Sequence, residues 1–286
     1  MLIYNFSGRS GPQIKLWEDR NIQVLHQVLR FMVGHFSQRD NVVAIELINE
    51  PKNSDRLQSL YENLLNEIRT IVQPHFGIAI GDAWDTNWYS MFAGNRKDFV
   101  ILDHHLYRCF TEDQISASVY DHVGRCHKEY LEMLMDAKHK SRDSLIIGEW
   151  SVGLNPRSFR GHNHHEQSKM WAHAQLEMYE RTAAGHFFWT LRKHDGDHDS
   201  GWNFKHAVNS GIMPSWLGGK QGLPNEGLAT LEQRDNECNE ATSQHDQFWS
   251  EQNLQPKEHW RFSEGFNRGW DDAVSFLIFI IESFKY

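Results

Sequence analysis

The amino-acid sequence predicts an α/β fold built on a parallel β-sheet that is buried on both faces. Apolar segments of strand length recur along the chain, and segments with helical spacing separate them. Strands that alternate with helices of about 10 to 15 residues are typical of βαβ units. With 286 residues, 40% of them hydrophobic, the chain can bury a sizeable core. A closed barrel and a doubly wound sheet both fit this alternation.

The elements are predicted in the following order. Apolar residues with helical spacing predict a helix over residues 22–36, and the apolar run at 42–48 predicts a buried strand. A second helix over 57–71 precedes a short strand at 77–80. The remaining predicted elements are a strand at 100–103, a helix over 122–138, a strand at 145–148, a helix over 168–181 and a strand at 186–189.

The last third of the chain differs in composition. Residues 219–257 are rich in Gly, Gln, Asn, Glu and Ser, which favours a long excursion that is helical in part and poorly ordered elsewhere. Apolar residues then return with helical spacing, and they predict a closing helix that packs back onto the sheet: Phe262, Phe266, Trp270, Val274 and Phe276.

Composition restricts the classes of partner. The net charge is −9 and the chain has no run of basic residues, so we expect no nucleic-acid partner. The longest apolar run, residues 276–281, is far shorter than the roughly 18 residues of a membrane span. The first residues lack the basic and apolar regions of a secretory signal. Aromatic residues exceed the needs of a core this size, which indicates stacking platforms for flat ligands such as sugar rings.

No metal or other cofactor is predicted. Cys109, Cys126 and Cys238 have no metal-ligand spacing. Two groups of loop residues contain several histidines but show no fixed ligand geometry: His162, His164 and His165 with Glu166, and His194 with Asp195, Asp197, His198 and Asp199.

Two glutamates lie where predicted strands end. Glu50 follows the strand at 42–48, and Glu149 ends the strand at 145–148. The carboxyl ends of parallel strands meet at one edge of a sheet, which is where active sites of barrels lie. Hydrolysis of a glycosidic bond needs such a pair, one carboxyl group to protonate the leaving oxygen and one to attack the anomeric carbon.

The residues around these glutamates resemble glycoside hydrolase family 5. Four motifs occur in the order of that family: Asn49-Glu50-Pro51, His105-Leu106-Tyr107, Gly148-Glu149-Trp150 and Phe187-Phe188-Trp189-Thr190. The residues in and around these motifs are similar to those of fungal exo-β-1,3-glucanases. The tail at residues 264–273 resembles fungal relatives of the same group.

This resemblance implies a role for each matched residue. Glu50 would be the acid/base and Glu149 the nucleophile. Asn49 would bind the sugar 2-hydroxyl group. His105 and Tyr107 would orient the sugar and the nucleophile, and Trp189 would form the floor under the reacting sugar. Asp82 and Trp84 are weaker candidates for sugar contact.

The resemblance also implies that the barrel is incomplete. Members of the family have three strands before the first helix found here, so we expect a (β/α)₈ TIM barrel with about five of its eight strands. Residues 1–204 would form this partial glycoside hydrolase barrel, and residues 205–286 would be an excursion and closing helix of the same domain. A missing neighbour would leave the strand at 42–48 as an exposed edge.

The leading hypothesis is a retaining β-glycosidase that acts on β-glucan in the manner of an exo-1,3-β-glucosidase. A family 5 enzyme for another β-glucoside, such as 1,6-glucan or a glycolipid, would use the same glutamates. A catalytically impaired enzyme or carbohydrate-binding remnant is the alternative from another class. The resemblance implies an extracellular or cell-wall location, whereas a true absence of a signal peptide would imply a cytoplasmic one.

Overall fold

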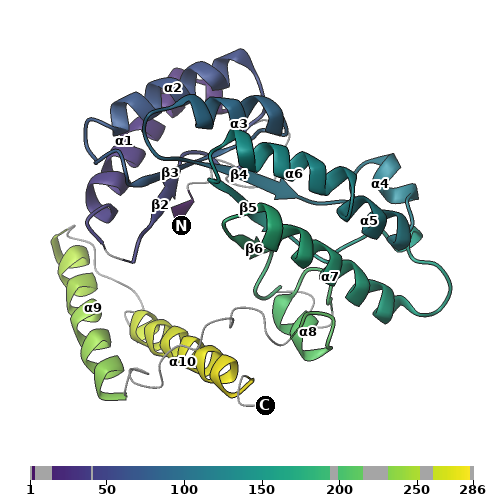
Figure 1. The fold of residues 1–286 in the computed structure, drawn as a ribbon. Helices are drawn as coiled ribbons and strands as arrows, with labels where there is room; N and C mark the ends of the chain where they lie inside the picture. Colours follow the sequence, from purple (N-terminus) through teal and green to yellow (C-terminus); the bar gives the residue numbers. More distant parts are fainter. Residues whose placement is uncertain are drawn as a thin grey trace. The chain divides into compact units, whose positions relative to one another are not determined.

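The computed structural model describes residues 2–3, 15–39, 41–193, 199–214, 231–251 and 260–283, with the backbone alone at 2–3, 15, 272 and 275–283. The chain divides into two compact units, Met1–Met213 and Pro214–Tyr286 (Figure 1). The predicted boundary at residue 204 falls inside the first unit. The assignment of residues 1–204 and 205–286 to one domain stays a prediction.

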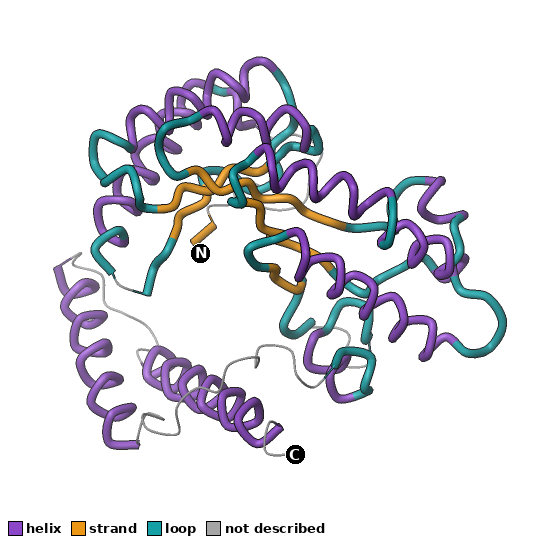
Figure 2. Tube along the Cα trace, viewed as in Figure 1, coloured by secondary structure: helices purple, strands orange, loops and turns teal. Residues whose placement is uncertain are grey.

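The first unit is built on one parallel sheet whose strands lie side by side in chain order (Figures 1 and 2). The five strands predicted from the sequence are present, so the incomplete TIM barrel is confirmed. The strands are β1 (Leu2–Ile3), β2 (Ala44–Glu46), β3 (Gly77–Gly81), β4 (Val100–Leu106), β5 (Leu145–Trp150) and β6 (His186–Phe188).

Helices connect the strands, and their apolar faces supply the core. In the first helix, for example, Leu25, Leu29 and Val33 are buried at helical spacing. The helices of this unit are α1 (Asp19–Phe36), α2 (Asp55–Ile68), α3 (Thr86–Asn95), α4 (Glu112–Ser116), α5 (Val119–Cys126), α6 (Glu129–Lys140), α7 (His164–Thr182) and α8 (Phe204–Asn209), with short 3₁₀ turns at Lys15–Trp17 and Pro156–Ser158.

Two predictions about these elements were wrong. The strand expected at 42–48 is not an unpaired edge, because β1 pairs with β2 in parallel and places Leu2 opposite Ile45. The single helix expected over 122–138 is broken between α5 and α6. After the break, α5 packs against α7, while α6 packs against both α3 and α7.

The described residues of the second unit form the helices α9 (Leu231–Glu251) and α10 (Trp260–Ser283). They pack against each other. Arg234 of α9 forms an ion pair with Asp271 of α10 at 3.0 Å. The predicted excursion is therefore helical over 231–251, and its other residues lie outside the described part of the chain. The docking of α10 on the barrel stays a prediction. None of the described helices is both long and apolar enough to cross a membrane.

Candidate active site

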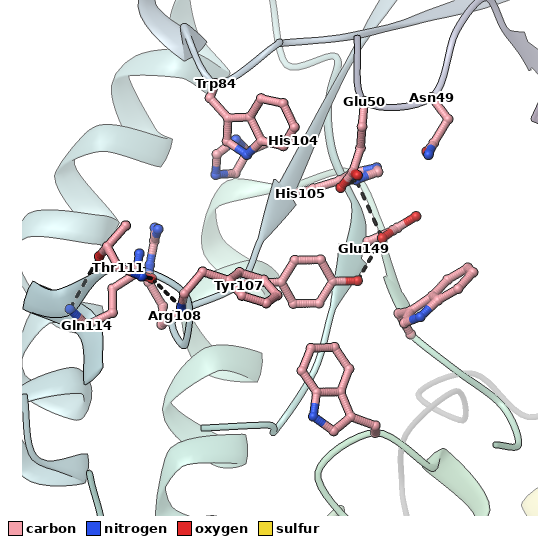
Figure 3. Close-up of a pocket in the computed structure, with 13 residues that line it drawn as sticks. Asn49, Glu50, Trp84, His104, His105, Tyr107, Arg108, Thr111, Gln114 and Glu149 are labelled. Carbon is pink, nitrogen blue, oxygen red and sulfur yellow. Dashed lines mark hydrogen bonds and ion pairs between the residues drawn. The ribbon is translucent and has the colours of Figure 1, made fainter. Parts of the chain in front are cut away.

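The two glutamates singled out from the sequence come together at the carboxyl ends of the strands (Figure 3). Glu50 lies four residues past the end of β2, with φ at +44°, a left-handed conformation that a non-glycine residue rarely adopts. Glu149 lies in β5, directly opposite His105 of β4. Positive φ values in non-glycine residues are frequent at functional sites, where the surrounding structure maintains them.

A cavity of about 730 Å³ contains both glutamates. Of the site residues predicted from the sequence, all except Asp82 line it: Asn49, Glu50, Trp84, His105, Tyr107, Glu149 and Trp189. The other lining residues were not predicted from the sequence: His104, Arg108, Phe110, Thr111, Gln114 and Trp202. His104 stands beside a predicted residue, and the rest lie on loops or on the short helix α4, where strand periodicity gives no signal.

The carboxylates of Glu50 and Glu149 are close neighbours. One oxygen of each, together with a ring nitrogen of His105, lie within 4.8 Å of one another. His105 Nδ1 is 2.8 Å from Glu50 Oε1 and 3.5 Å from Glu149 Oε2. The Tyr107 hydroxyl donates a hydrogen bond of 2.7 Å to Glu149 Oε2. Carboxyl groups about 5 Å apart are the spacing of retaining glycosidases, whereas inverting enzymes need about 6.5 to 9.5 Å.

The charges around this pair are strongly coupled. Burial by itself would lower the pKa of His105, but the Asp103, Glu50 and Glu149 carboxylates raise it to about 10, so the ring is an imidazolium at neutral pH. Burial raises the pKa of Glu149, although His105 and the Tyr107 hydrogen bond both act to lower it. The Tyr107 bond therefore favours an ionised Glu149, as the sequence suggested, but burial outweighs it.

Aromatic side chains form much of the cavity wall. Trp84 and Trp189 are 62% and 52% exposed, so each leaves a ring face available for stacking. The rings of Tyr107 and Trp202 are 5.3 Å apart. Trp202 comes from a polar loop with no strand pattern, and only the surplus of tryptophan in the sequence could have indicated it.

Asp82 and Asn49 differ in what they offer to a ligand. Asp82 accepts hydrogen bonds from the Thr86 hydroxyl at 2.5 Å and the Trp84 backbone N–H at 3.0 Å, and it lies 2.6 Å from His104 Nδ1. These bonds occupy both of its oxygens and position Trp84. Asn49 Oδ1, by contrast, is buried without a hydrogen-bond partner among the described residues. It remains able to accept a bond from a ligand hydroxyl group.

Two groups of side chains in the described part of the chain bring three possible metal ligands within 4.8 Å of one another. One is Glu50, His105 and Glu149, and the other is Glu46, Asp103 and His105. His105 holds a proton in the folded chain, so a metal ion would have to displace that proton to bind the ring. In the first histidine-rich group noted in the sequence, His165 is exposed and its ring contacts the Ser210 carbonyl. Residues 194–198 of the second histidine-rich group lie outside the described residues.

The buried charges predict how stability changes with pH. Burial, with a smaller contribution from Asp103, raises the pKa of Glu46 to about 9, and that of His105 is about 10. Both folded-state values exceed the unfolded ones, so both groups contribute stability that is present at low pH and lost as the pH rises. We expect urea denaturation to show the free energy of unfolding falling by several kcal/mol between about pH 4.5 and 10, because Glu46 starts to lose its contribution above about pH 4.5 and His105 above about pH 6.5.

Glu46→Gln should flatten this decline, because an amide has no proton to lose. Glu177→Gln, on the exposed face of α7, is the matched control and should leave the slope unchanged. A stability that rises towards pH 10 in the unsubstituted chain would contradict the assigned charge states.

The chain was compared with known proteins. Residues 13–195, more than half of the chain, match the family model "Cellulase (glycosyl hydrolase family 5)". Residues 230–283 match the "Glucan 1,3-beta-glucosidase 3 C-terminal domain", which corresponds to the α9 and α10 unit.

Relatives and solved structures give the following matches. Glucan 1,3-beta-glucosidase 3 of Schizosaccharomyces pombe is 26% identical over 282 residues, which cover 95% of this chain and 57% of the relative. A glucan 1,3-beta-glucosidase of Lachancea kluyveri is 30% identical over 151 residues, covering 48% of this chain and 32% of the relative. The structure of an endoglucanase superposes with a TM-score of 0.46 at 17% identity, covering 67% of this chain and 66% of the other. The chain spans about half or less of the length of these two curated relatives.

Proposed function

Because this chain belongs to glycosyl hydrolase family 5, we propose that it hydrolyses β-glucosidic bonds by double displacement. Glu149 would attack the anomeric carbon, and Glu50 would protonate the leaving oxygen and then activate water. The observation that carries this proposal is the spacing of the two carboxylates, whose nearest oxygens lie within 4.8 Å. At that separation a nucleophilic carboxylate reaches the anomeric carbon directly, with no room for an intervening water molecule.

The division of roles between the glutamates is supported by their neighbours. The Tyr107 hydroxyl donates to Glu149 and not to Glu50, and a donor stabilises the ionised form that a nucleophile requires. The His105 ring contacts both carboxylates and does not discriminate between them. Glu50 is the more exposed, with a side-chain exposure of 37% against 13% for Glu149. A group that must exchange protons with the leaving group and then with water benefits from this access.

The other lining residues would bind the sugar. Asn49 Oδ1, which has no hydrogen-bond partner in the described part of the chain, would accept a bond from a sugar hydroxyl group, and Trp189 exposes a ring face that can lie under the reacting sugar. His105 would orient Glu50, and Trp84 would contact the sugar from the opposite loop. Asp82 would act by holding Trp84 rather than by touching the sugar.

The substrate we propose is a β-1,3-linked glucan cleaved from its end. Two curated relatives carry the name glucan 1,3-beta-glucosidase, and the cavity of about 730 Å³ can take a few sugar rings. β-1,6-Glucan and a glycolipid headgroup are the alternatives with the same chemistry, since linkage is read by loops and aromatic platforms rather than by the glutamates.

A carbohydrate-binding remnant is the second candidate. The observation that favours it is the charge around the presumed nucleophile: within the described residues, Glu149 has an ion pair with His105 but none with a lysine or arginine. Burial then leaves the pKa of Glu149 raised, which opposes the ionised state needed for attack. Such a protein would bind a glucan through the same aromatic walls without cleaving it.

Product analysis separates these candidates. We expect laminari-oligosaccharides incubated with the chain to release glucose that is initially the β-anomer, observed by ¹H NMR before mutarotation. Initial α-glucose would overturn the retaining mechanism. Saturable binding of the same oligosaccharides without release of glucose would establish the remnant.

A further inference from the structure

Asp103 is a buried carboxylate of β4 that has no part in the proposed reaction. Its side chain is fully inaccessible to solvent. One oxygen, Oδ1, accepts a hydrogen bond of 2.7 Å from the Gly148 backbone N–H. The other, Oδ2, lies 3.6 Å from His105 Nε2. Each oxygen thus faces a group that adjoins one of the two glutamates.

The first contact acts on Glu149. The register between β4 and β5 shifts at this point, since His104 pairs with Ile147 while His105 pairs with Glu149, leaving Gly148 as the extra residue of a bulge. A bulge re-aims the side chains that follow it. Because the Asp103 carboxylate accepts the Gly148 N–H, it holds the bulge that turns Glu149 towards His105.

The second contact acts on Glu50. The His105 ring lies between two carboxylates, with Nε2 towards Asp103 and Nδ1 towards Glu50 at 2.8 Å. At 3.6 Å this contact is an ion pair and not a hydrogen bond, and the Asp103 charge attracts the Nε2 side of the buried imidazolium. The attraction keeps the ring turned so that Nδ1 faces Glu50.

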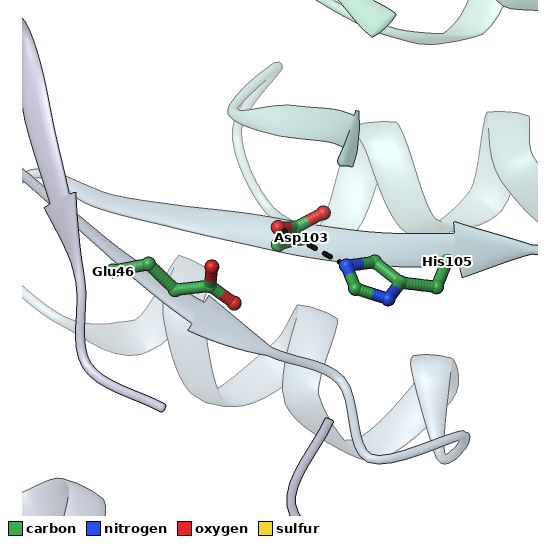
Figure 4. A group of neighbouring side chains, drawn as sticks. All are labelled: Glu46, Asp103 and His105. Carbon is green, nitrogen blue, oxygen red and sulfur yellow. Dashed lines mark ion pairs between the residues drawn. The ribbon is translucent and has the colours of Figure 1, made fainter. Parts of the chain in front are cut away.

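The other carboxyl groups near His105, those of Glu46 and Glu149, do not place a negative charge beside Nε2. Glu46 of β2 points towards Asp103 and His105 (Figure 4), but burial raises its pKa so far that it is neutral at pH 7. Both of its oxygens lack a hydrogen-bond partner in the described part of the chain. Glu149 is 3.5 Å from His105 Nδ1, on the same side as Glu50. Among the described residues, Asp103 is thus the charged group that faces the Nε2 side of the ring.

We propose that Asp103 is a positioning residue that couples both glutamates, holding Glu149 through the Gly148 N–H and Glu50 through the His105 ring. The inference rests on the proposed function for what the two glutamates do. The coupling itself is a property of the folded chain and can be measured without any turnover.

The test is an NMR titration of His105 in the whole chain, with its ring signals assigned by comparison with His105→Gln. In Asp103→Asn the size of the side chain and an acceptor for the Gly148 N–H are kept, but the charge is lost. We expect the pKa of His105 to fall by about one to three pH units, as it does when an adjacent opposite charge is removed. Asp82→Asn is the matched control, because Asp82 faces the neighbouring imidazole of His104 at 2.6 Å. It should leave the titration of His105 unchanged.

A second measurement tests the hydrogen bond from the Gly148 N–H to Asp103. Hydrogen exchange of the Gly148 amide should be slow in the unsubstituted chain and in Asp103→Asn, and at least tenfold faster in Asp103→Ala, which has no acceptor. If Asp103→Asn leaves the titration of His105 where it was, or Asp82→Asn moves it equally, Asp103 does not position His105 and the proposal fails. These readouts stand even if the chain releases no glucose, so failure of the proposed function is separately visible.

Discussion

Replacing Glu149 by alanine is expected to lower the hydrolysis of every β-glucoside by about 10⁴-fold or more, because no covalent glycosyl-enzyme can form without the nucleophile. Glu50→Ala should behave differently. A substrate such as 2,4-dinitrophenyl β-glucoside has a leaving group that needs no protonation, so its glycosylation step should survive in this variant.

Azide decides which glutamate has which role, since it is a nucleophile that needs no general base. In Glu50→Ala it should intercept the glycosyl-enzyme and give a β-glucosyl azide. In Glu149→Ala it should attack the substrate directly and give the α-glucosyl azide. The anomer is read from the ¹H coupling constant of the product. The opposite pairing of variants and anomers would reverse the assignment of Glu50 and Glu149.

This experiment matters because the charges do not assign the roles by themselves. Burial raises the pKa of Glu149, the presumed nucleophile, while Tyr107 and His105 act to lower it. A bound sugar that excludes water and donates hydrogen bonds would change both contributions. Trapping with azide reports the roles of the two glutamates while substrate is bound, whereas the pKa directions describe the chain without substrate.

Gly148→Ala is expected to cause a large loss of stability. A Cβ at this position would lie 2.2 Å from both carboxylate oxygens of Asp103, which are fixed between two strands. Overpacking of a buried site that cannot relax costs about 3 kcal/mol. We expect a loss of that size in urea denaturation, together with loss of activity because Glu149 is the next residue in the chain.

Gly124→Ala in α5 is the control for the effect of a methyl group itself. Nothing lies within 4 Å of the Cβ that this change would add. Alanine favours a helix by about 1 kcal/mol over glycine, so this variant should be as stable as the unsubstituted chain or more so. A Gly148→Ala chain that matches it in stability would show that the bulge relaxes freely, contrary to the packing described here.

The sequence by itself determined the alternation of strands and helices and the place of the two glutamates. Both are local properties: the apolar runs at 42–48 and 145–148 predict buried strands, and a carboxylate just past the end of each must lie at the carboxyl edge of a parallel sheet. The predicted family followed from short motifs around these same positions. These features can be predicted without knowing any contact between residues that are far apart in the sequence.

Only the tertiary structure decided what lies beside those glutamates. Asp103, Gly148 and His105 form one unit because a bulge shifts the register of β4 against β5, and no periodicity within either strand reports that shift. Trp202 enters the cavity from a loop, and Asp82 turns inward to Thr86 and His104. These placements depend on which strands pair and in what register. They result from contacts between residues that are far apart in the sequence, and local sequence patterns do not predict such contacts.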